Sequence, residues 1–308
     1  MKTIFIVNPK AGQGKDIQKL IDNINAVSER LNADTEIYIT KAVGDGQAFV
    51  RQYCEKHGVA RFIACGGDGT LSEVLNGTIG FDNAEIGVIP IGTGNDFCRN
   101  FQSAIDFKNI EFQILGDVVK CDAIKYTTEF DGQITTGYCA NMFNIGFDCN
   151  VADMMADIKK KPFISGSLAY FVSILSNLVI KKCIYLEIEL DGTVVHNGPL
   201  LLTSVANGCF CGGGVKSNPL AELNDGLINI NIIKDVTRLQ FIKLLPYYMK
   251  GTFLKLKGIE KVLSSQKCKR VTITPHSGSL RLCNDGEITD AGKTEFEIVQ
   301  DVFNFVAR

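Results

Sequence analysis

Three glycine-rich loops follow apolar runs in the N-terminal part of the chain, and they hold residues that could do chemistry. They are NPKAGQGK (Asn8 to Lys15), GGDGT (Gly66 to Thr70) and IPIGTGNDF (Ile89 to Phe97). Loops of this kind let successive backbone N–H groups converge on an anion. Asp68, inside the second loop, offers the oxygen ligand that Mg²⁺ prefers. We therefore predict that these loops bind a polyphosphate together with Mg²⁺.

The GGDGT loop also has a plainer explanation. It can be a tight strand-to-helix turn in which Asp68 accepts hydrogen bonds from neighbouring backbone. Neither common phosphate motif is complete, because the P-loop would need Gly at Pro9 and Ser or Thr at Asp16, and Phe97 replaces the third glycine of G-x-G-x-x-G. Three loops at the carboxyl ends of parallel strands still favour a phosphate site of another design, because ligands bind at that edge of an open sheet. Thr70 is expected to cap the helix that follows GGDGT.

The spacing of apolar residues predicts the elements that hold these loops. Strands that alternate with helices imply βαβ crossovers and a parallel sheet. The expected strands are residues 2–8, 35–40, 61–64 and 86–90, and the expected helices are residues 16–31, 47–57 and about 70–76.

The pattern changes to strands near Gly116, which predicts a second, β-rich domain. Asp191-Gly192 and Asp285-Gly286 are hairpin-type turn signals within it. We place an α/β nucleotide-binding domain over residues 1–120 and the β-rich domain over residues 121–287. The expected strands are 118–126, 134–147, 184–190, 193–196, 200–206, 227–233, 271–274 and 280–283, with helical insertions at 151–181 and 238–250.

Composition excludes several classes of protein. The 32 basic and 34 acidic residues nearly cancel, which argues against a nucleic-acid-coating protein. Eleven cysteines without a C-x-x-C pair, and only three histidines, disfavour a zinc site and suit reduced thiols in a cytoplasmic protein. The longest apolar stretch, Ser167 to Ile180, is shorter than the roughly 20 residues that a membrane span needs. We therefore expect a soluble protein, at most peripheral at the inner face of the membrane.

GGDGT with Glu73 behind it, and then IPIGTGNDF, resemble the diacylglycerol kinase catalytic domain, which bacterial soluble lipid kinases share with sphingosine and ceramide kinases. Further matches follow in order: NIGFD (144–148), VANG (205–208), GGG (212–214), PLAELNDG (219–226) and DGE (285–287). The resemblance implies an α/β domain like that of NAD kinases and phosphofructokinases, an antiparallel β-sandwich domain, and an active site between them. It also implies that residues 288–308 return to the first domain.

The resemblance assigns ATP contacts to the three loops and to the end of the second strand. Ala11 departs from the pattern, because the family has serine there, and a hydroxyl contact to phosphate is lost. Lys10 and Lys15 add positive charge nearby, although a solvated surface position also explains both and suits Lys15 at least as well. The implied ATP-binding residues are Asn8, Pro9, Lys10, Ala11, Gly12, Thr40, Gly66, Gly67, Asp68, Gly69, Thr70, Leu71, Ser72, Thr93 and Asn95.

The catalytic groups implied by the resemblance are all carboxylates. Asp68, Asp96 and Asp122 resemble the set that organises catalytic Mg²⁺ and its water network. Glu287 is the expected general base, since a lipid hydroxyl must lose its proton as it attacks phosphorus. The plainer explanation of DGE is a hairpin turn with an exposed acid.

A second, structural Mg²⁺ is implied in the β domain. The Asp225 side chain would bind it, with the positions of Glu222 and Leu227 supplying further ligands, expected to be backbone carbonyls. A simple turn that leads into a strand would explain the same residues.

The implied reaction moves the γ-phosphate of ATP to the hydroxyl of diacylglycerol and yields phosphatidic acid. The alternatives are another lipid such as a sphingoid base or phosphatidylglycerol, a soluble alcohol such as NAD, or a nucleotide- or lipid-binding regulator without catalysis. Lysine-flanked apolar segments at 159–182 and 239–258 suit an anionic bilayer, although core-facing helices with solvated lysines also explain them. The expected partners are a nucleotide and a lipid substrate at the membrane surface; nucleic acid is not expected, and a homodimer stays open.

Overall fold

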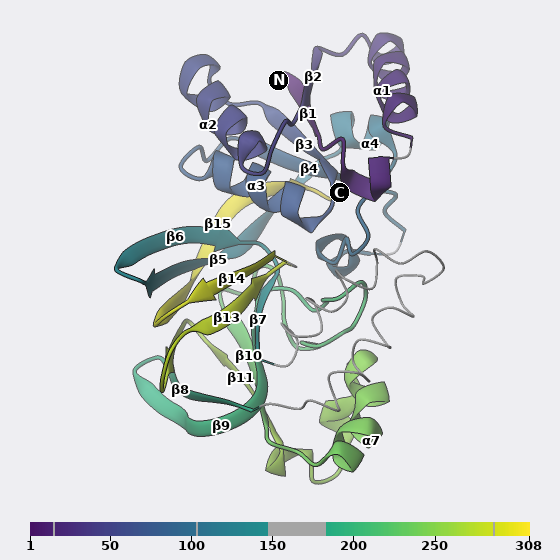
Figure 1. Ribbon diagram of the computed structural model, residues 1–308. Helices are drawn as coiled ribbons and strands as arrows, with labels where there is room; N and C mark the ends of the chain where they lie inside the picture. Colours follow the sequence, from purple (N-terminus) through teal and green to yellow (C-terminus); the bar gives the residue numbers. More distant parts are fainter. Residues whose placement is uncertain (15, 103, 147–182, 286) are drawn as a thin grey trace. The chain divides into compact units, whose positions relative to one another are not determined.

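The computed structural model describes residues 1–14, 16–102, 104–146, 183–285 and 287–308, and these form two compact units (Figure 1). Unit 1 comprises Met1–Ala123 and Gln300–Arg308, and unit 2 comprises Ile124–Val299. The sequence predicts domain boundaries after residues 120 and 287. The structure divides the chain slightly later, after Ala123 and after Val299. The helix expected at 151–181, with the lysines of segment 159–182, lies outside the described residues.

Unit 1 is built on a parallel sheet in the order β2–β1–β3–β4–β15. Val7 lies opposite both Ile39 and Cys65, and Gly66 lies opposite Pro90, so the strands end at one common edge. Every residue of β1 and β3 is buried, as expected for parallel strands covered on both faces. The strands are β1 (Thr3–Val7), β2 (Thr35–Ile39), β3 (Arg61–Gly66), β4 (Glu85–Pro90) and the last residues of β15 (Thr294–Val306).

Four helices cover the two faces of this sheet in the described part of unit 1 (Figure 1). Helices α1 and α4 pack on the face that carries Phe5 and Val7. Helix α2 lies on the other face, where Gly46 comes close to Ile6, and it packs against α3 through Gly77. The helices are α1 (Ile17–Leu31), α2 (Asp45–His57), α3 (Asp68–Thr78) and α4 (Ile110–Leu115), the last of which the sequence did not predict.

Arg61, at the start of β3, ties the sheet to α4 from a buried position. Its Nε donates to Glu85 Oε2 at 2.6 Å. Its other nitrogens donate to the carbonyls of Ile114 at 2.7 Å and Gly116 at 2.9 Å, among others. These are the carbonyls that a helix leaves without partners at its C-terminal end, where a positive charge is also favourable.

Unit 2 is an antiparallel assembly in the order β14–β13–β7–β9–β8–β12–β15. β10 pairs with β9 and β11, and β5 pairs with β15 and β6. Its core contains Phe143, Ile188, Val205, Ile230 and Phe296, which are all buried. The strands are β5 (Val118–Phe130), β6 (Gln133–Cys139), β7 (Met142–Gly146), β8 (Ile184–Leu190), β9 (Thr193–Ala206), β10 (Ile228–Lys234), β11 (Leu263–Cys268), β12 (Arg270–Pro275), β13 (Leu280–Asn284) and β14 (Glu287–Ala291).

Two strand predictions in unit 2 are wrong. The single strand expected at 134–147 is two strands, because β6 pairs with β5 whereas β7 pairs with β13 and β9. The two strands expected at 193–196 and 200–206 are one, because Gly198 adopts a φ of +145° that lets the chain continue, and Pro199 pairs with Tyr185. A glycine is needed for that conformation.

Helix α7 (Arg238–Met249) lies where a helix was expected. A capping box starts it: Thr237 Oγ1 accepts from Gln240 N at 3.3 Å, and Gln240 Oε1 accepts from Thr237 N at 2.8 Å. Leu245 and Tyr248 on its inner face belong to a second apolar cluster of unit 2. None of the helices in the described ranges has the length and apolar character needed to cross a membrane.

The ten described cysteines are all free thiols, as the sequence predicts. Cys65, directly before GGDGT, is fully buried, and burial raises the pKa of its thiol far above the ordinary value. Burial, with the negative charge of Asp68 second, raises the pKa of Cys98 to about 12. Burial, with Asp122 second, raises that of Cys121 to about 12 as well. Such thiols stay protonated and make poor nucleophiles at neutral pH.

Candidate nucleotide and phosphoryl-transfer site

The three glycine-rich loops meet at the carboxyl edge of the unit 1 sheet. Asn8 N donates to Cys65 O at 3.0 Å, and Ile91 N donates to Gly66 O at 3.0 Å. A side-chain bond joins the first two loops, because Asn8 Nδ2 donates to Thr70 Oγ1 at 3.2 Å. The first two loops are therefore bonded to each other, and the third is bonded to the second.

Asn8 also organises the first loop internally. Its Oδ1 accepts from Lys10 N at 2.9 Å, and its carbonyl accepts from Ala11 N at 3.1 Å. The turn contains Pro9 and Lys10 and leads into a short 3₁₀ helix from Ala11 to Gly14. The serine that the family has at position 11 is therefore not needed to shape this loop.

The glycines allow the loops to approach each other closely. A Cβ atom on Gly92 would lie 2.4 Å from the Cα of Gly67, and one on Gly12 would lie 2.7 Å from the carbonyl oxygen of Ile91. Gly12 also has a φ of +59°, which favours glycine. Loop-to-loop packing thus requires Gly92 and Gly12 whether or not a ligand is bound.

Helix α3 begins inside GGDGT. Gly67 occupies the N-cap position without a side-chain cap, and the helix runs for 11 residues from Asp68. The expectation that Thr70 caps this helix is wrong, because the helix starts two residues earlier and the Thr70 hydroxyl accepts from Asn8. Leu71 is buried, whereas Gly69 and Ser72 are partly exposed in the first turn. The first amide groups of α3 have no partner within the helix and can bind an anion.

Asp68 and Asp96 form a close pair of carboxylates at this edge. Asp68 Oδ1 accepts from the backbone N–H groups of Asp96 at 2.8 Å and Phe97 at 3.2 Å. A Cβ on Gly94 would lie 2.9 Å from Asp68 Oδ2 and 3.2 Å from Asp96 Oδ2, so both carboxylates border the same small space. Arg99 Nε lies 3.6 Å from Asp96 Oδ1.

The electrostatics of this pair favour a cation. Burial, followed by the charge of Asp96, raises the pKa of Asp68 from 3.8 to about 6, although three backbone N–H groups oppose the change. Desolvation and a like charge both disfavour the ionised carboxylate. A divalent cation between the two carboxylates would remove both penalties, so the residues present fit Mg²⁺.

The third loop adds a buried acceptor next to the carboxylates. Asn95 has a φ of +52°, and its Nδ2 donates to Gly92 O at 2.8 Å. Its Oδ1 is buried and has no hydrogen-bond partner among the residues that the structure describes. Thr93 is exposed at the same turn. A ligand hydroxyl or a water molecule could satisfy this oxygen, which an apolar neighbour could not do.

Thr40 and Glu73, which the sequence analysis also named, form hydrogen bonds with backbone groups near the site. Thr40, at the end of β2, is buried and donates from both N and Oγ1 to Val7 O at 2.9 and 3.4 Å. Glu73 of α3 accepts from Gly44 N and Gly46 N, both at 2.9 Å, and so holds the start of α2. The sequence analysis assigned no role to Glu73. An acidic side chain near the start of a helix is favourable, because it can accept hydrogen bonds from the free N–H groups there.

Asp122 lies on β5, where it is 1% exposed. Its Oδ1 accepts from Asp301 N of β15 at 2.9 Å. A catalytic role for Asp122 stays a prediction, and the bond to Asp301 gives this residue a part in joining two strands.

Glu287 begins β14 in unit 2 and is exposed. It lies opposite Asn284 of β13, so the hairpin expected at Asp285-Gly286 is present. Asp285 has a structural role, because its Oδ1 accepts from Met142 N at 3.2 Å and its own N donates to Met142 O at 3.3 Å. Burial, the nearby Cys139 and the charge of Glu287, in that order, raise the pKa of Tyr126. The base role of Glu287 stays a prediction.

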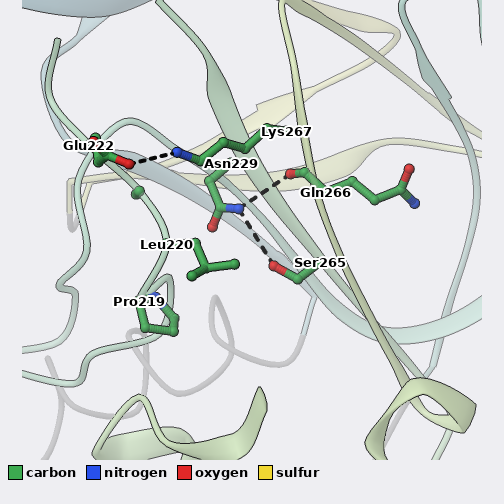
Figure 2. A pocket seen from close by; sticks show the side chains of 8 residues that line it. Pro219, Leu220, Glu222, Asn229, Ser265, Gln266 and Lys267 are labelled. Atoms are coloured by element: carbon green, nitrogen blue, oxygen red, sulfur yellow. Dashed lines mark hydrogen bonds and ion pairs between the residues drawn. The ribbon is translucent and has the colours of Figure 1, made fainter. Parts of the chain in front are cut away.

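The residues expected to bind a structural Mg²⁺ already have a cationic partner. Lys267 Nζ lies 3.0 Å from Glu222 Oε1 (Figure 2), and it also contacts Asp225 Oδ2. Asp225 Oδ1 accepts from Leu227 N at 3.0 Å. Within the described part of the chain, no group of three or more His, Cys, Asp or Glu side chains is placed to hold a metal ion, at this loop or at the Asp68–Asp96 pair. Binding of a structural Mg²⁺ by Asp225, with Glu222 and Leu227, stays a prediction.

Comparison with known proteins places the chain in a family. Residues 2–126 match the diacylglycerol kinase catalytic domain, and residues 141–307 match the YegS C-terminal NAD kinase beta sandwich-like domain. The second match covers more than half of the chain. The chain therefore belongs to the family of diacylglycerol kinases and YegS-type lipid kinases, and the family implies the use of ATP.

Two relatives agree with this assignment. Diacylglycerol kinase of Bacillus subtilis (strain 168) is 27% identical over 285 residues, which cover 92% of this chain and 88% of the relative. Lipid kinase YegS of Escherichia coli (strain K12) is 31% identical over 206 residues, which cover 64% of this chain and 63% of the relative.

Two solved structures share the fold. A diacylglycerol kinase from Bacillus anthracis str. Sterne has a TM-score of 0.69 at 22% identity, covering 100% of this chain and 97% of that one. Yeast NADH kinase complexed with NADH has a TM-score of 0.54 at 12% identity, covering 100% of this chain and 84% of that one. These likenesses confirm the expected fold, an N-terminal α/β domain followed by an antiparallel β-sandwich domain.

Proposed function

We propose that the protein transfers the γ-phosphate of ATP to the hydroxyl of diacylglycerol, or of a similar lipid alcohol, and so produces phosphatidic acid or its analogue. The observation that carries this proposal is the Asp68–Asp96 carboxylate pair at the edge where three glycine-rich loops meet. Family membership supports a lipid kinase, and the name of the B. subtilis relative supports diacylglycerol as the acceptor.

The loops would bind the nucleotide mainly through backbone. The first amides of α3 would contact the phosphates, and Asn95 Oδ1 would accept from a ligand hydroxyl or water. Asp68 and Asp96 would hold Mg²⁺, which supplies charge neutralisation at the phosphates when bound. Phosphoryl transfer depends on positioning and electrostatics more than on covalent help, which suits a site without histidine or cysteine nucleophiles.

Glu287 is proposed to accept the proton of the lipid hydroxyl. The hydroxyl oxygen meanwhile bonds to the γ-phosphorus, and the bond between that phosphorus and ADP breaks. Its carboxylate is exposed at the start of a strand, where an incoming lipid can reach it. Met142 N of β7 donates to Asp285 Oδ1, which holds Asp285 at the end of β13. A base of this kind contributes about 10²–10⁴-fold to the rate.

Transfer of labelled phosphate from ATP to a panel of acceptors tests the proposal. The panel contains diacylglycerol, a sphingoid base, phosphatidylglycerol and NAD, and the product is identified by mass. We expect phosphatidic acid, and a loss of about 10²-fold or more in Asp68→Asn and Glu287→Gln with unchanged circular dichroism. Phosphorylation of NAD without any lipid product would refute the proposal that the acceptor is a lipid. Full activity in both variants would refute the proposed site.

We propose further that the lipid is taken from an anionic membrane surface through the outer face of α7. Leu239, Ile242 and Tyr247 are exposed by 72%, 48% and 45%, and their spacing puts them on the side of the helix opposite the buried Leu245 and Tyr248. The exposed side chains of Lys243 and Lys250 lie on this outer face as well. An apolar stripe with basic residues suits a surface of anionic lipid.

Vesicle sedimentation tests the membrane proposal. The wild-type protein is mixed with vesicles of phosphatidylglycerol and phosphatidylcholine, and with phosphatidylcholine alone. Leu239→Ser and Ile242→Ser should each weaken binding to the anionic vesicles by about tenfold, because a buried Leu or Ile contributes about 1.5–3 kcal/mol. Ile134→Ser is the matched control, since Ile134 is 73% exposed on β6. Equal binding by all variants would refute the role of α7.

A further inference from the structure

Lys267 is placed by β11 so that its side chain reaches the loop before β10. Lys267 lies opposite Asn229 in the β10–β11 pair. Its ammonium contacts carboxylates of two loop residues, Glu222 at 3.0 Å (Figure 2) and Asp225 at a shorter distance. The loop begins at Asn218, a fully buried residue whose Nδ2 donates to Asn229 O at 3.0 Å.

The ammonium occupies the centre of this acidic turn. The side chain of Asp225 is 19% exposed and that of Lys267 is 29% exposed, so the pair is partly shielded from water. Both oxygens of Asp225 are in use, one by Lys267 and the other by Leu227 N. A divalent cation at the same carboxylates would have to displace Lys267 Nζ or bind beside a like charge, which is unfavourable.

A pocket of about 260 Å³ next to this contact is also lined by Lys267, together with Leu220, Glu222, Asn229 and Ser265 (Figure 2). Glu222, which also lines it, has a side chain that is 65% exposed. The contacts of Lys267 therefore join β11 to the 218–227 loop at a position that solvent, and with it a dissolved metal ion, can reach.

We propose that the Lys267 ammonium is the permanent cation of this loop and takes the place of the structural Mg²⁺ that the family resemblance implies. Unit 2 then folds and holds its 218–227 loop without a divalent cation. Any Mg²⁺ requirement of the protein is confined to the nucleotide site.

The wild-type protein and Asp68→Asn provide the first test, in the absence of nucleotide. Thermal unfolding is followed by circular dichroism in EDTA and in MgCl₂, and Mg²⁺ binding is titrated calorimetrically. For Asp68→Asn, which lacks one carboxylate of the nucleotide site, we expect the unfolding temperature to agree within about 1 °C in the two buffers, since an ion that does not bind unit 2 cannot stabilise it. Tight binding of one Mg²⁺ that is lost in Asp225→Asn but kept in Asp68→Asn would overturn the proposal.

Lys267→Met provides the second test, with Lys257→Met as a control that removes the same charge from an exposed residue of unit 2. Lys267→Met should unfold about 2–4 °C lower than wild type in EDTA and regain this loss in MgCl₂, because two carboxylates are left without a cation. Lys257→Met should match wild type in both buffers. Wild-type behaviour of Lys267→Met in both buffers would overturn the proposal, and if this variant is insoluble the wild-type titration decides.

Discussion

Asp68→Asn should make the protein more stable and inactive at the same time. The pKa of Asp68 is raised from 3.8 to about 6, so the folded state binds this proton more tightly than the unfolded state does. Between these two pH values the stability of the wild type falls as the pH rises, because the unfolded chain releases its proton first. Above about pH 6 the whole penalty is present, and below about pH 4 it is absent.

The magnitude follows from the same two values. A difference from 3.8 to about 6, at 1.36 kcal/mol per pKa unit, gives an upper limit of about 3 kcal/mol. Because Asp68 is only partly buried, solvent screening reduces this to about 1–2 kcal/mol. Asparagine keeps an oxygen that can accept from Asp96 N and Phe97 N, so the substitution removes the charge and retains the loop contacts.

Urea unfolding at pH 4 and pH 7.5, without nucleotide, measures this effect. The helical signal at 222 nm reports mainly on unit 1, which contains α1 to α4, whereas α7 is the only described α-helix of unit 2. Asp68→Asn should equal wild type at pH 4 and exceed it by about 1–2 kcal/mol at pH 7.5. Asp82→Asn, an exposed acid of the same unit, is the control and should show no such pH dependence. A stability difference that is the same at both pH values would refute the reasoning, as would a wild-type kcat/KM that does not rise through about pH 6.

Three other substitutions test the packing of unit 1. Gly92→Ala should lose about 1–3 kcal/mol and at least tenfold in ATP affinity, measured by urea unfolding and nucleotide titration, because its Cβ would overlap backbone at 2.4 Å; wild-type values would contradict this. Arg61→Met should lose about 3–5 kcal/mol in urea unfolding, since Glu85 and the last carbonyls of α4 lose their partner, and a loss below about 1 kcal/mol would count against it. Glu73→Gln should speed hydrogen exchange of the two amides that Glu73 binds by about tenfold, because one carboxylate oxygen becomes a donor; unchanged exchange would rule out the anchoring role.

The elements of unit 1 were predictable because they obey strong local patterns. The apolar spacing of α1 and the continuous apolar runs of β1 and β3 place these elements within a residue or two of their observed bounds. Helix α4 was missed because six residues are too few to show a helical period. The prediction split β9 into two strands, because the composition of Asn197-Gly198-Pro199 is typical of a turn. In the structure these three residues pair with β8, so the strand continues through them.

The site was predictable at the level of loops and not of individual bonds. The sequence places Asp68 between glycines, but the nearness of Asp96 depends on how the third loop folds back. The start of α3 at Asp68 was missed because Thr70 is a good cap by composition, whereas Gly67 takes that position. Lys267 lies 42 residues beyond Asp225 and belongs to a strand that was not predicted, so nothing local indicated their contact.

The buried thiols offer a way to observe the site without altering the protein. Cys65 precedes GGDGT, Cys98 follows Asp96 closely, and Cys121 is next to Asp122. Because burial keeps these thiols protonated, each reacts with an alkylating reagent only when its surroundings open. Mass-spectrometric rates of alkylation at the three positions would therefore report how often each part of the nucleotide site opens, and which openings ATP suppresses, in the native chain.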